Sequence, residues 1–394
     1  MMPATSTIAV VGGGLVGATT AMALAHRGYK VTLIDRRAPQ IQRGALGMDI
    51  RNVALSPASQ ALLAQVGVWG ATPAAPYRHM RVWEQWGSSE LVFDAKDVNC
   101  QQLGWLVEVS PLLVHIWQQM AARPNLELML DEIADVGVES EHVRVQTNKG
   151  QVRQFDFLIA ADGAQSLVRR VMGLQVQQYP VHQVALTTVV QTSDPHQQTA
   201  WQRFLTDGPL AFLPSVDEHL CSIVWSQSQV SAERRLNLSD ADFCREIGFA
   251  FEHRLGEVVR VDQRLSFPLT QQRLPNCAPH ARVLLIGDAM RVVHPLAGLG
   301  VNLGLEDVEQ LLDVAGPGVN LAAPGLWTRF ARQRQSRAQM MIRMLSALQK
   351  VYGSADPGLA LLRNLGVSSL NRLDGLKHQI MREAMGLARD VHVS

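Results

Sequence analysis

Residues 6–35 constrain the fold more than any other part of the chain. Ser6–Val11 is a short apolar and β-branched run, Gly12–Gly17 has the spacing Gly-x-Gly-x-x-Gly, and a helical pattern follows through Arg27. A second strand pattern, Lys30–Ile34, ends at Asp35. Strand, glycine turn, helix and strand in this order predict a βαβ unit that binds a dinucleotide. The alternative is a glycine-rich turn in an α/β domain that binds nothing.

Each glycine of this motif has a mechanical reason. Of Gly12, Gly14 and Gly17, one makes the tight turn, one lets the backbone approach a pyrophosphate, and one allows close packing of the helix. The helix N-terminus then faces the phosphates and stabilises their charge. Asp35 ends the second strand, where a carboxylate can accept a hydrogen bond from a ribose hydroxyl.

Two later segments decide which dinucleotide the chain binds. In Phe155–Ser166 a buried strand pattern runs into the turn Asp162-Gly163, and Ser166 is placed to cap the next helix. In Ala281–Ala289 a second buried strand pattern ends at Gly287-Asp288, and a glycine-rich segment, His294–Gly304, leads into another helix. A single Asp-Gly pair is typical of an ordinary turn, whereas these segments together with the first motif indicate a cofactor site.

The three motifs together resemble the flavin aromatic hydroxylases of the para-hydroxybenzoate hydroxylase superfamily, over nearly the whole chain. Further segments are similar to the bacterial ubiquinone-biosynthesis hydroxylases: Ile50–Ser59, Leu103–Glu108, Gly208–Pro214, Phe267–Leu269 and Ala384–Gly386. A smaller set favours the branch that hydroxylates 2-polyprenyl-3-methyl-6-methoxy-1,4-benzoquinol: Pro76–Arg78, Trp83-Glu84, Trp201-Gln202 and Asp207–Pro209.

The resemblance implies an α/β fold with a Rossmann-like FAD-binding domain of the glutathione-reductase type. An antiparallel-sheet substrate domain is inserted into it, and C-terminal helices follow. We expect the FAD-binding domain to comprise residues 1–75, 103–174 and 272–325, the substrate domain residues 76–102 and 175–271, and the helical region residues 326–394.

The resemblance also implies which residues bind FAD: Gly12, Gly14, Gly17, Asp35, Arg51, Asp162, Asp288, Gly300, Val301 and Asn302. The flavin ring is expected against the loop that carries His294, Pro295, Gly298 and Gly300. We assign His294 to this loop and not to proton transfer, because a lone histidine beside a proline is more often structural.

The late motif departs from the family pattern at two places. The chain has Met290-Arg291 where relatives usually have Ala-His, and Leu299 where they usually have Gln. Neither change affects Asp288 or the glycines. We expect the first to alter how the loop is anchored and the second to remove an amide near the flavin ring.

The implied activity is that of a monooxygenase in ubiquinone biosynthesis. NAD(P)H reduces the FAD, O2 adds to the reduced flavin as a C4a-hydroperoxide, and the distal oxygen hydroxylates the ring of a polyprenylated phenol or benzoquinol. One alternative is a flavin oxidoreductase that inserts no oxygen. Another is a non-catalytic flavoprotein subunit of a lipid-biosynthesis assembly.

Candidates to contact the substrate come from the inserted segments. Phe212, Pro214 and Trp225 are candidates to line an apolar pocket, and the alternative is that they only pack the sheet. No arginine or histidine stands out as a clamp for a substrate carboxylate. This favours a lipophilic polyprenyl substrate over a charged benzoate.

Composition excludes several other classes of function. Lys and Arg total 36 against 35 Asp and Glu, which gives no field that would attract a nucleic acid. The four cysteines lie far apart, which predicts neither a metal site nor disulfides. The cysteine pattern therefore indicates a reduced, cytoplasmic compartment. The short uncharged start and the lack of a long apolar run predict neither signal peptide nor membrane span.

A helical pattern after residue 325 has two interpretations. Apolar residues alternate there with Arg329, Arg332, Arg334, Arg337, Arg343 and Lys350. A basic amphipathic face would allow peripheral contact with the inner membrane or with a ubiquinone-biosynthesis complex. The alternative is a helix packed on the FAD-binding domain with a solvated basic side. The sequence is also compatible with a homo-oligomer.

Overall fold

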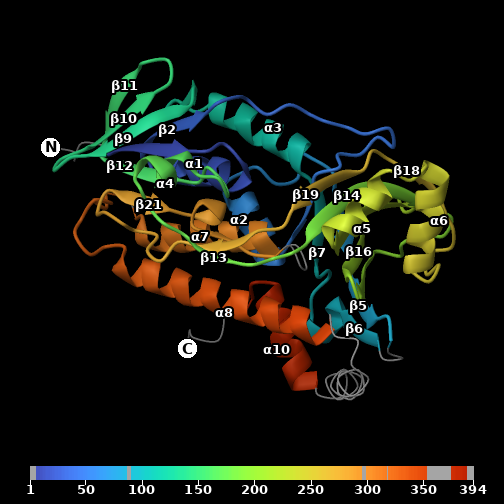
Figure 1. Ribbon diagram of the computed structural model, residues 1–394. Coiled ribbons are helices and arrows are strands. Elements are labelled where there is room, and N and C mark those ends of the chain that lie inside the picture. The colour runs from blue at the N-terminus through green and yellow to red at the C-terminus, as the bar shows by residue number, and fades with distance from the viewer. Residues whose placement is uncertain (1–5, 87–89, 295–298, 317, 353–373, 388–394) are drawn as a thin grey trace.

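The computed structural model describes residues 6–86, 90–294, 299–316, 318–352 and 374–387. Figure 1 shows two sheets side by side, with the long helix α8 (Thr328–Tyr352) along the lower edge of the molecule. One sheet carries the glycine motifs and the other is built from the inserted segments. The predicted α/β architecture is therefore confirmed.

A parallel five-stranded sheet forms the core of the first layer. Its strands, in spatial order, are β21 (Val283–Leu285), β12 (Phe157–Ala160), β1 (Thr7–Val11), β2 (Lys30–Asp35) and β8 (Leu126–Leu130). All four neighbouring pairs are parallel. The apolar, β-branched runs predicted as buried strands form it because both faces of a parallel sheet are covered.

Helices cover this sheet and small sheets flank it. The helices are α1 (Leu15–His26), α2 (Pro57–Gln65), α3 (Val109–Ala121), α4 (Leu167–Val171) and α7 (Leu299–Val314). One flanking sheet has the order β3 (Asn52–Leu55), β7 (Gly104–Glu108), β4 (Ala74–Tyr77). The others are β11 (Val152–Phe155), β10 (Val143–Thr147), β9 (Ile133–Val138), and β13 (Gln177–Tyr179), β20 (Gln271–Arg273), β22 (Arg291–Val292).

An eight-stranded sheet forms the second layer. Its order is β18 (Val258–Val261), β14 (Val184–Thr192), β17 (Leu220–Gln227), β16 (Gly208–Pro214), β15 (Thr199–Leu205), β5 (His79–Glu84), β6 (Glu90–Asp94), and β19 (Leu265–Pro268) pairs with β14. Only the β15–β5 pair of this sheet is parallel. The two inserted segments thus meet in one sheet.

The two faces of this large sheet are covered by different parts of the chain. α5 (Gln229–Leu236) and α6 (Asp240–Ala250) lie over one face, and a buried cluster that includes Phe212, Trp225 and Phe251 fills the space beneath α6. The opposite face packs against the layer of the parallel sheet, where Val189 and Leu106 belong to one buried cluster and Leu213 packs against it. A short 3-10 helix, η1 (Ala95–Val98), follows β6 and packs near α10 (Asp374–Ala384).

Candidate active site

The predicted motifs lie together at one edge of the parallel sheet. β1, β2, β12 and β21 are neighbours in that sheet, and their carboxyl ends share this edge. The first glycine turn follows β1, Asp35 ends β2, Asp162 follows β12, and Gly287-Asp288 follows β21. Ligands of open α/β sheets bind at this edge, so the sheet brings residues from four distant parts of the chain to one site.

The glycines of the first turn divide into two kinds. Gly12 has φ +98° and Gly17 packs so closely that a Cβ there would lie 1.9 Å from the carbonyl oxygen of Gly12. Gly14 is exposed at the N-terminus of α1, and a Cβ there would have no atom within 4 Å. Packing therefore requires Gly12 and Gly17, whereas Gly14 leaves open space at a helix N-terminus, where a phosphate group fits.

Asp35 and Trp117 fix the shape of this turn. The backbone N–H of Gly13 donates to Oδ2 of Asp35 at 2.6 Å, and Nε1 of Trp117 donates to the carbonyl oxygen of Gly13 at 2.9 Å. Oδ1 of Asp35 accepts from the N–H of Arg37 at 3.2 Å. The carboxylate thus orders the loop, and its contact with a ribose hydroxyl stays a prediction. Trp117 was not among the residues predicted from the sequence.

The Asp162 turn is tied to the late motif by an arginine that the sequence analysis missed. Oδ2 of Asp162 accepts from the N–H of Val168 at 3.1 Å, and the Ser166 hydroxyl caps α4 as predicted, accepting from the N–H of Arg169 at 3.0 Å. The Arg169 guanidinium donates to the carbonyl oxygens of Ala289 at 2.9 Å and Ala164 at 2.6 Å. Burial raises the pKa of Asp162, against the effect of its hydrogen bonds.

Val16 of α1 packs closely against two glycines of the late motif, Gly287 and Gly304. A Cβ at Gly304 would lie 2.5 Å from one methyl group of Val16, and a Cβ at Gly287 would lie 3.3 Å from the other. Asp288, next to Gly287, is exposed at the sheet edge, yet desolvation by the surrounding protein raises the pKa of its carboxyl group. Because the carboxylate of Asp288 is exposed while Gly287 and Ala289 are buried, it is accessible to a ligand.

A buried chain of charges anchors this turn. Asp307 is fully buried, and its Oδ2 accepts from the Gly287 N–H at 2.8 Å and from Nη1 of Arg291 at 2.6 Å. Its Oδ1 accepts from Nε of Arg334 at 2.5 Å. The departure at Arg291 therefore does affect the anchoring, because this guanidinium joins the turn to α7.

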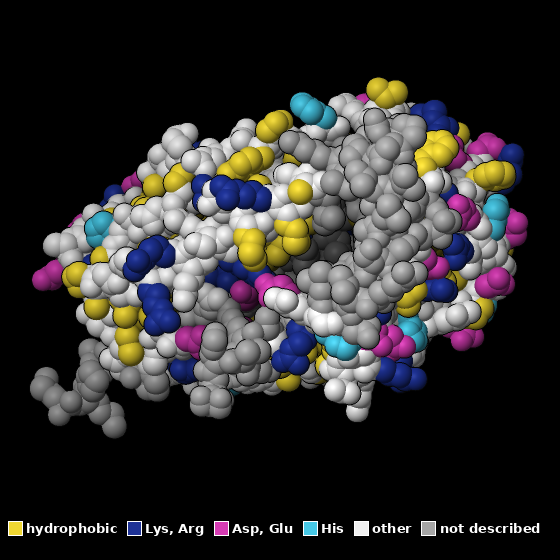
Figure 2. Space-filling model, turned by 90° about the horizontal axis from the view of Figure 1, so that it is seen from below, with side chains coloured by type: hydrophobic (Ala, Val, Ile, Leu, Met, Phe, Trp, Pro, Cys, Tyr) yellow, Lys and Arg dark blue, Asp and Glu magenta, His cyan; other side chains and the backbone are white. Residues whose placement is uncertain are grey.

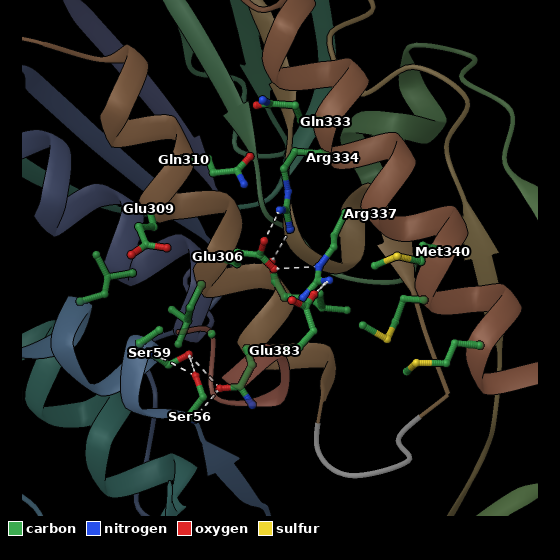
Figure 3. Close-up of a pocket in the computed structure, with 18 of the residues that line it drawn as sticks. Ser56, Ser59, Glu306, Glu309, Gln310, Gln333, Arg334, Arg337, Met340 and Glu383 are labelled. Atoms are coloured by element: carbon green, nitrogen blue, oxygen red, sulfur yellow. Dashed lines mark hydrogen bonds and ion pairs between the residues drawn. The ribbon is translucent and has the colours of Figure 1, made fainter. Parts of the chain in front are cut away.

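Arg334 corrects one expectation from the sequence. We included it in the basic face of the C-terminal helix, but it is only 1% exposed. Burial alone would lower the pKa of Arg334, yet the charges of Asp307 and Glu306 outweigh this and raise it above the usual value. Figure 3 shows Arg334 and Arg337 from α8 directed at Glu306, with Glu383 beyond, beside a cavity of about 720 Å³.

The loop expected at the flavin ring is described only at its two ends. Pro295 and Gly298 lie outside the described residues, as does the side chain of Leu299. His294 is fully buried, with Nε2 3.2 Å from Oε1 of Gln183. Burial lowers the pKa of His294 to about 4, so the ring is neutral at pH 7.

The second end of this loop is fastened by Asn302. Its Oδ1 accepts from the Ser56 N–H at 2.9 Å and the Ser59 hydroxyl at 2.8 Å, and its Nδ2 donates to the Ala54 carbonyl oxygen at 2.7 Å. Gly300, in the first turn of α7, has open space around it, and Val301 is half-buried. The N-terminal turn of α7 is thereby held in place by β3 and α2.

The remaining predicted residues lie outside the turns described so far. The side chain of Arg51 is 54% exposed, just before β3, with Nε 3.9 Å from Oδ1 of Asp49. Phe212 and Trp225 are buried on the α6 side of the large sheet, where Phe212 stacks on Phe251 with ring centroids 3.7 Å apart. Pro214 is paired with Cys221 of that same face. Their packing is that of a sheet core, the alternative left open by the sequence.

The site fits the FAD that the sequence implies. The N-termini of α1 and α7 both lie there, and Gly14 and Gly300 leave room for close backbone approach. Helix N-termini stabilise negative charge, which suits a pyrophosphate at α1 and a reduced flavin ring at α7. Carboxylates can accept hydrogen bonds from hydroxyl groups, and the contacts of Asp35 and Asp288 with sugar and ribityl hydroxyl groups stay predictions.

Substitutions at Gly14 and Gly17 should separate cofactor contact from packing. Gly17→Ala forces α1 away from Gly12, so the apoprotein should lose about 1–3 kcal/mol of unfolding free energy. Gly14→Ala should leave it within about 0.5 kcal/mol but weaken FAD binding roughly tenfold or more, a loss of about 1.4 kcal/mol. Urea unfolding of the apoprotein and FAD titration measure the two effects. If Gly14→Ala binds FAD like the wild type, the phosphates lie elsewhere.

His294 should make stability depend on pH. Its pKa is about 4 in the folded chain and about 6.5 unfolded, so the unfolded chain binds the extra proton between these values. Stability is full above pH 6.5 and is lost as the pH falls towards 4. From pH 7 to 5, wild type should lose about 2 kcal/mol more than His294→Gln in urea unfolding. Equal losses in the two proteins would contradict the buried neutral ring.

Comparison with known proteins agrees with this site. A family model described as FAD binding domain matches residues 5–344. The 3-demethoxyubiquinol 3-hydroxylase of Escherichia coli (strain K12) is 34% identical over 391 residues, which cover 96% of this chain and 98% of the relative. Ubiquinone hydroxylase UbiL of Rhodospirillum rubrum is 31% identical and covers 96% of this chain, with 89% of its own length matched.

A solved structure shows the same fold at lower sequence identity. The p-nitrophenol 4-monooxygenase PnpA from Pseudomonas putida DLL-E4 superposes with a TM-score of 0.79, at 18% identity, covering 98% of this chain and 99% of that one. The predicted FAD cofactor and monooxygenase class are confirmed by these comparisons together. The chain belongs to the family of FAD-dependent ubiquinone-biosynthesis hydroxylases, which are aromatic-ring monooxygenases.

Proposed function

We propose that this chain hydroxylates the ring of a polyprenylated methoxy-methyl-benzoquinol, using NAD(P)H and O2. The name of the Escherichia coli relative, a 3-demethoxyubiquinol 3-hydroxylase, supports a substrate of this kind. When bound, FAD supplies hydride acceptance, oxygen activation and hydroxyl transfer. The protein has to bind and orient a lipophilic ring and keep water away from it.

The face of the large sheet toward the FAD-binding layer carries this proposal. One row of paired residues crosses β5, β15, β16, β17 and β14 on this face: Val82, Gln202, Ala211, Val224 and Thr187. No member of the row is charged, and Val82, Ala211 and Val224 are only half-buried in mid-sheet. A neutral quinol ring suits such a surface, whereas a benzoate would require a cation.

The same face lies beside Val293 and His294, the described start of the loop expected at the flavin ring. His294 contacts Gln183, whose Nε2 donates to the Asp207 carbonyl oxygen at 2.9 Å, next to the start of β16. Val293 packs with Phe204 of β15 in one buried cluster. We place the substrate ring between this loop and the row, on the opposite face from Phe212 and Trp225.

An isotope experiment tests the reaction. Purified FAD-loaded protein, NAD(P)H and the polyprenylated methoxy-methyl-benzoquinol under ¹⁸O2 should give a product with one labelled oxygen, identified by mass spectrometry. Val224→Glu buries a carboxylate against the ring and should lower kcat/KM by on the order of a hundredfold, about 2.7 kcal/mol, while Val259→Glu, at an exposed site, serves as control. NAD(P)H oxidation without labelled product would favour the oxidoreductase, and FAD binding without substrate-stimulated NAD(P)H oxidation the non-catalytic subunit.

We also propose that α8 contacts an anionic membrane, where a polyprenyl substrate resides. In Figure 2, basic and hydrophobic side chains lie near each other on the face that α8 borders in Figure 1. α8 contains no Asp or Glu. Arg329, Arg332 and Arg343 are exposed and form no ion pair within the described residues, and Met340 and Met344 are 50% and 44% exposed beside them. No helix among the described residues is long and apolar enough to cross a bilayer.

Vesicle sedimentation tests this contact. The triple variant Arg329→Gln, Arg332→Gln, Arg343→Gln should bind phosphatidylglycerol vesicles roughly a hundredfold more weakly at low salt, since each basic residue contributes about 1 kcal/mol near an anionic surface. A control triple variant at exposed residues elsewhere, Arg170→Gln, Arg245→Gln and Arg260→Gln, removes the same charge. Equal losses in both variants would show that net charge alone matters. A biosynthetic complex and a homo-oligomer stay predictions.

A further inference from the structure

We propose that Arg291 and Asp307 are positioning residues for the cofactor, which hold the Gly287-Asp288 turn through one shared carboxylate oxygen and thereby determine how this turn binds FAD. The inference deepens the proposed function and rests on the role of Asp288 as a ligand of FAD. Neither residue was among the cofactor residues expected from the sequence.

One oxygen atom links the turn to both residues. Oδ2 of Asp307 accepts the Gly287 N–H and Nη1 of Arg291 at the same time, at 2.8 and 2.6 Å. Gly287 has φ +57°, so the turn is held in a conformation that glycine favours. Asp288 is the next residue, which means that any shift of Asp307 moves the ligand carboxylate as well.

Burial makes these charges effective over short distances. Arg291 is 2% exposed and Asp307 is 0% exposed, so neither is screened by water as surface charges are. Arg334 completes the arrangement from α8, because its Nε holds the other carboxylate oxygen of Asp307 at 2.5 Å. Without such partners a buried carboxylate would be strongly destabilising.

The charged groups around Asp288 come from three elements. Arg291 lies on β22, Asp307 on α7, and Arg169 on α4, where its guanidinium donates to Ala289 beside Asp288. Desolvation raises the pKa of Asp288, the charge of Arg291 lowers it, and the charge of Asp307 raises it. Removing Arg291 should therefore raise this pKa, and neutralising Asp307 should lower it.

The test measures FAD binding across acidic and neutral pH, from the quenching of flavin fluorescence. Asp288→Asn identifies the step in the pH profile that belongs to Asp288, because this step disappears in that variant. Arg291→Met should move the midpoint of the step to higher pH, because it removes the charge that lowers the pKa of Asp288. Arg291→Lys keeps the charge and should restore the wild-type midpoint, and Asp307→Asn should move it to lower pH.

Arg337, which does not contact Asp307 and pairs instead with Glu306 and Glu383, offers a matched control. Arg337→Gln removes a cation that pairs with Glu306 and Glu383 but leaves the contact between Arg334 and Asp307. This variant should keep the wild-type midpoint. If Asp307→Asn does not fold, the difference in midpoint between Arg291→Met and Arg291→Lys still tests the inference.

Two results would overturn the inference. One is an unchanged midpoint in Arg291→Met, and the other is an equal loss of FAD affinity at every pH in Arg291→Met and Arg291→Lys, which a purely structural role predicts. Because the readout is FAD binding, its failure is separate from that of the proposed reaction. A protein that shows the shifts but gives no labelled quinol would refute only the proposed substrate.

Discussion

Helix α1 packs against the first glycine turn with no room for one additional carbon atom. The approach of Gly17 to the carbonyl oxygen of Gly12, where a Cβ would lie at 1.9 Å, fixes the direction in which α1 leaves β1. That direction places Val16 against Gly287 and Gly304. The turn after β21 and the start of α7 therefore take their positions from a contact made near residue 17.

A single carboxylate then joins the cofactor site to the C-terminal part of the chain. Asp307 accepts hydrogen bonds from Gly287, Arg291 and Arg334, which lie on the turn, β22 and α8 respectively. Buried ion pairs contribute little net stability, but breaking one leaves a costly unpaired charge. The arrangement therefore specifies geometry more than it adds stability, and Arg291, a departure from the expected motif, is part of it.

The sequence predicted features that depend on local spacing and missed those that depend on distant contacts. The glycine turns, the cap at Ser166 and the buried strands follow from residues close together in the chain. The role of Phe212 and Trp225 could not be predicted in this way. The alternating pattern assigns residues to the two faces of a strand, but it does not show which face lies toward the flavin. Arg334 occupies the apolar stripe of Phe330, Ala338 and Met341 at helical spacing, a signal of a buried ion pair that we interpreted as surface charge.

The chain of contacts from Gly12 to Arg334 also orders events during synthesis. The residues that shape the turn at Gly287 are separated from the first glycine motif by most of the polypeptide, and the partner that holds Asp307 from α8 comes later still. A ribosome-bound chain that has reached the end of α7 already contains every glycine of the site and Arg291, but not Arg334, the second guanidinium that pairs with Asp307. The pairing of Asp307 is therefore complete only after α8 has been synthesised.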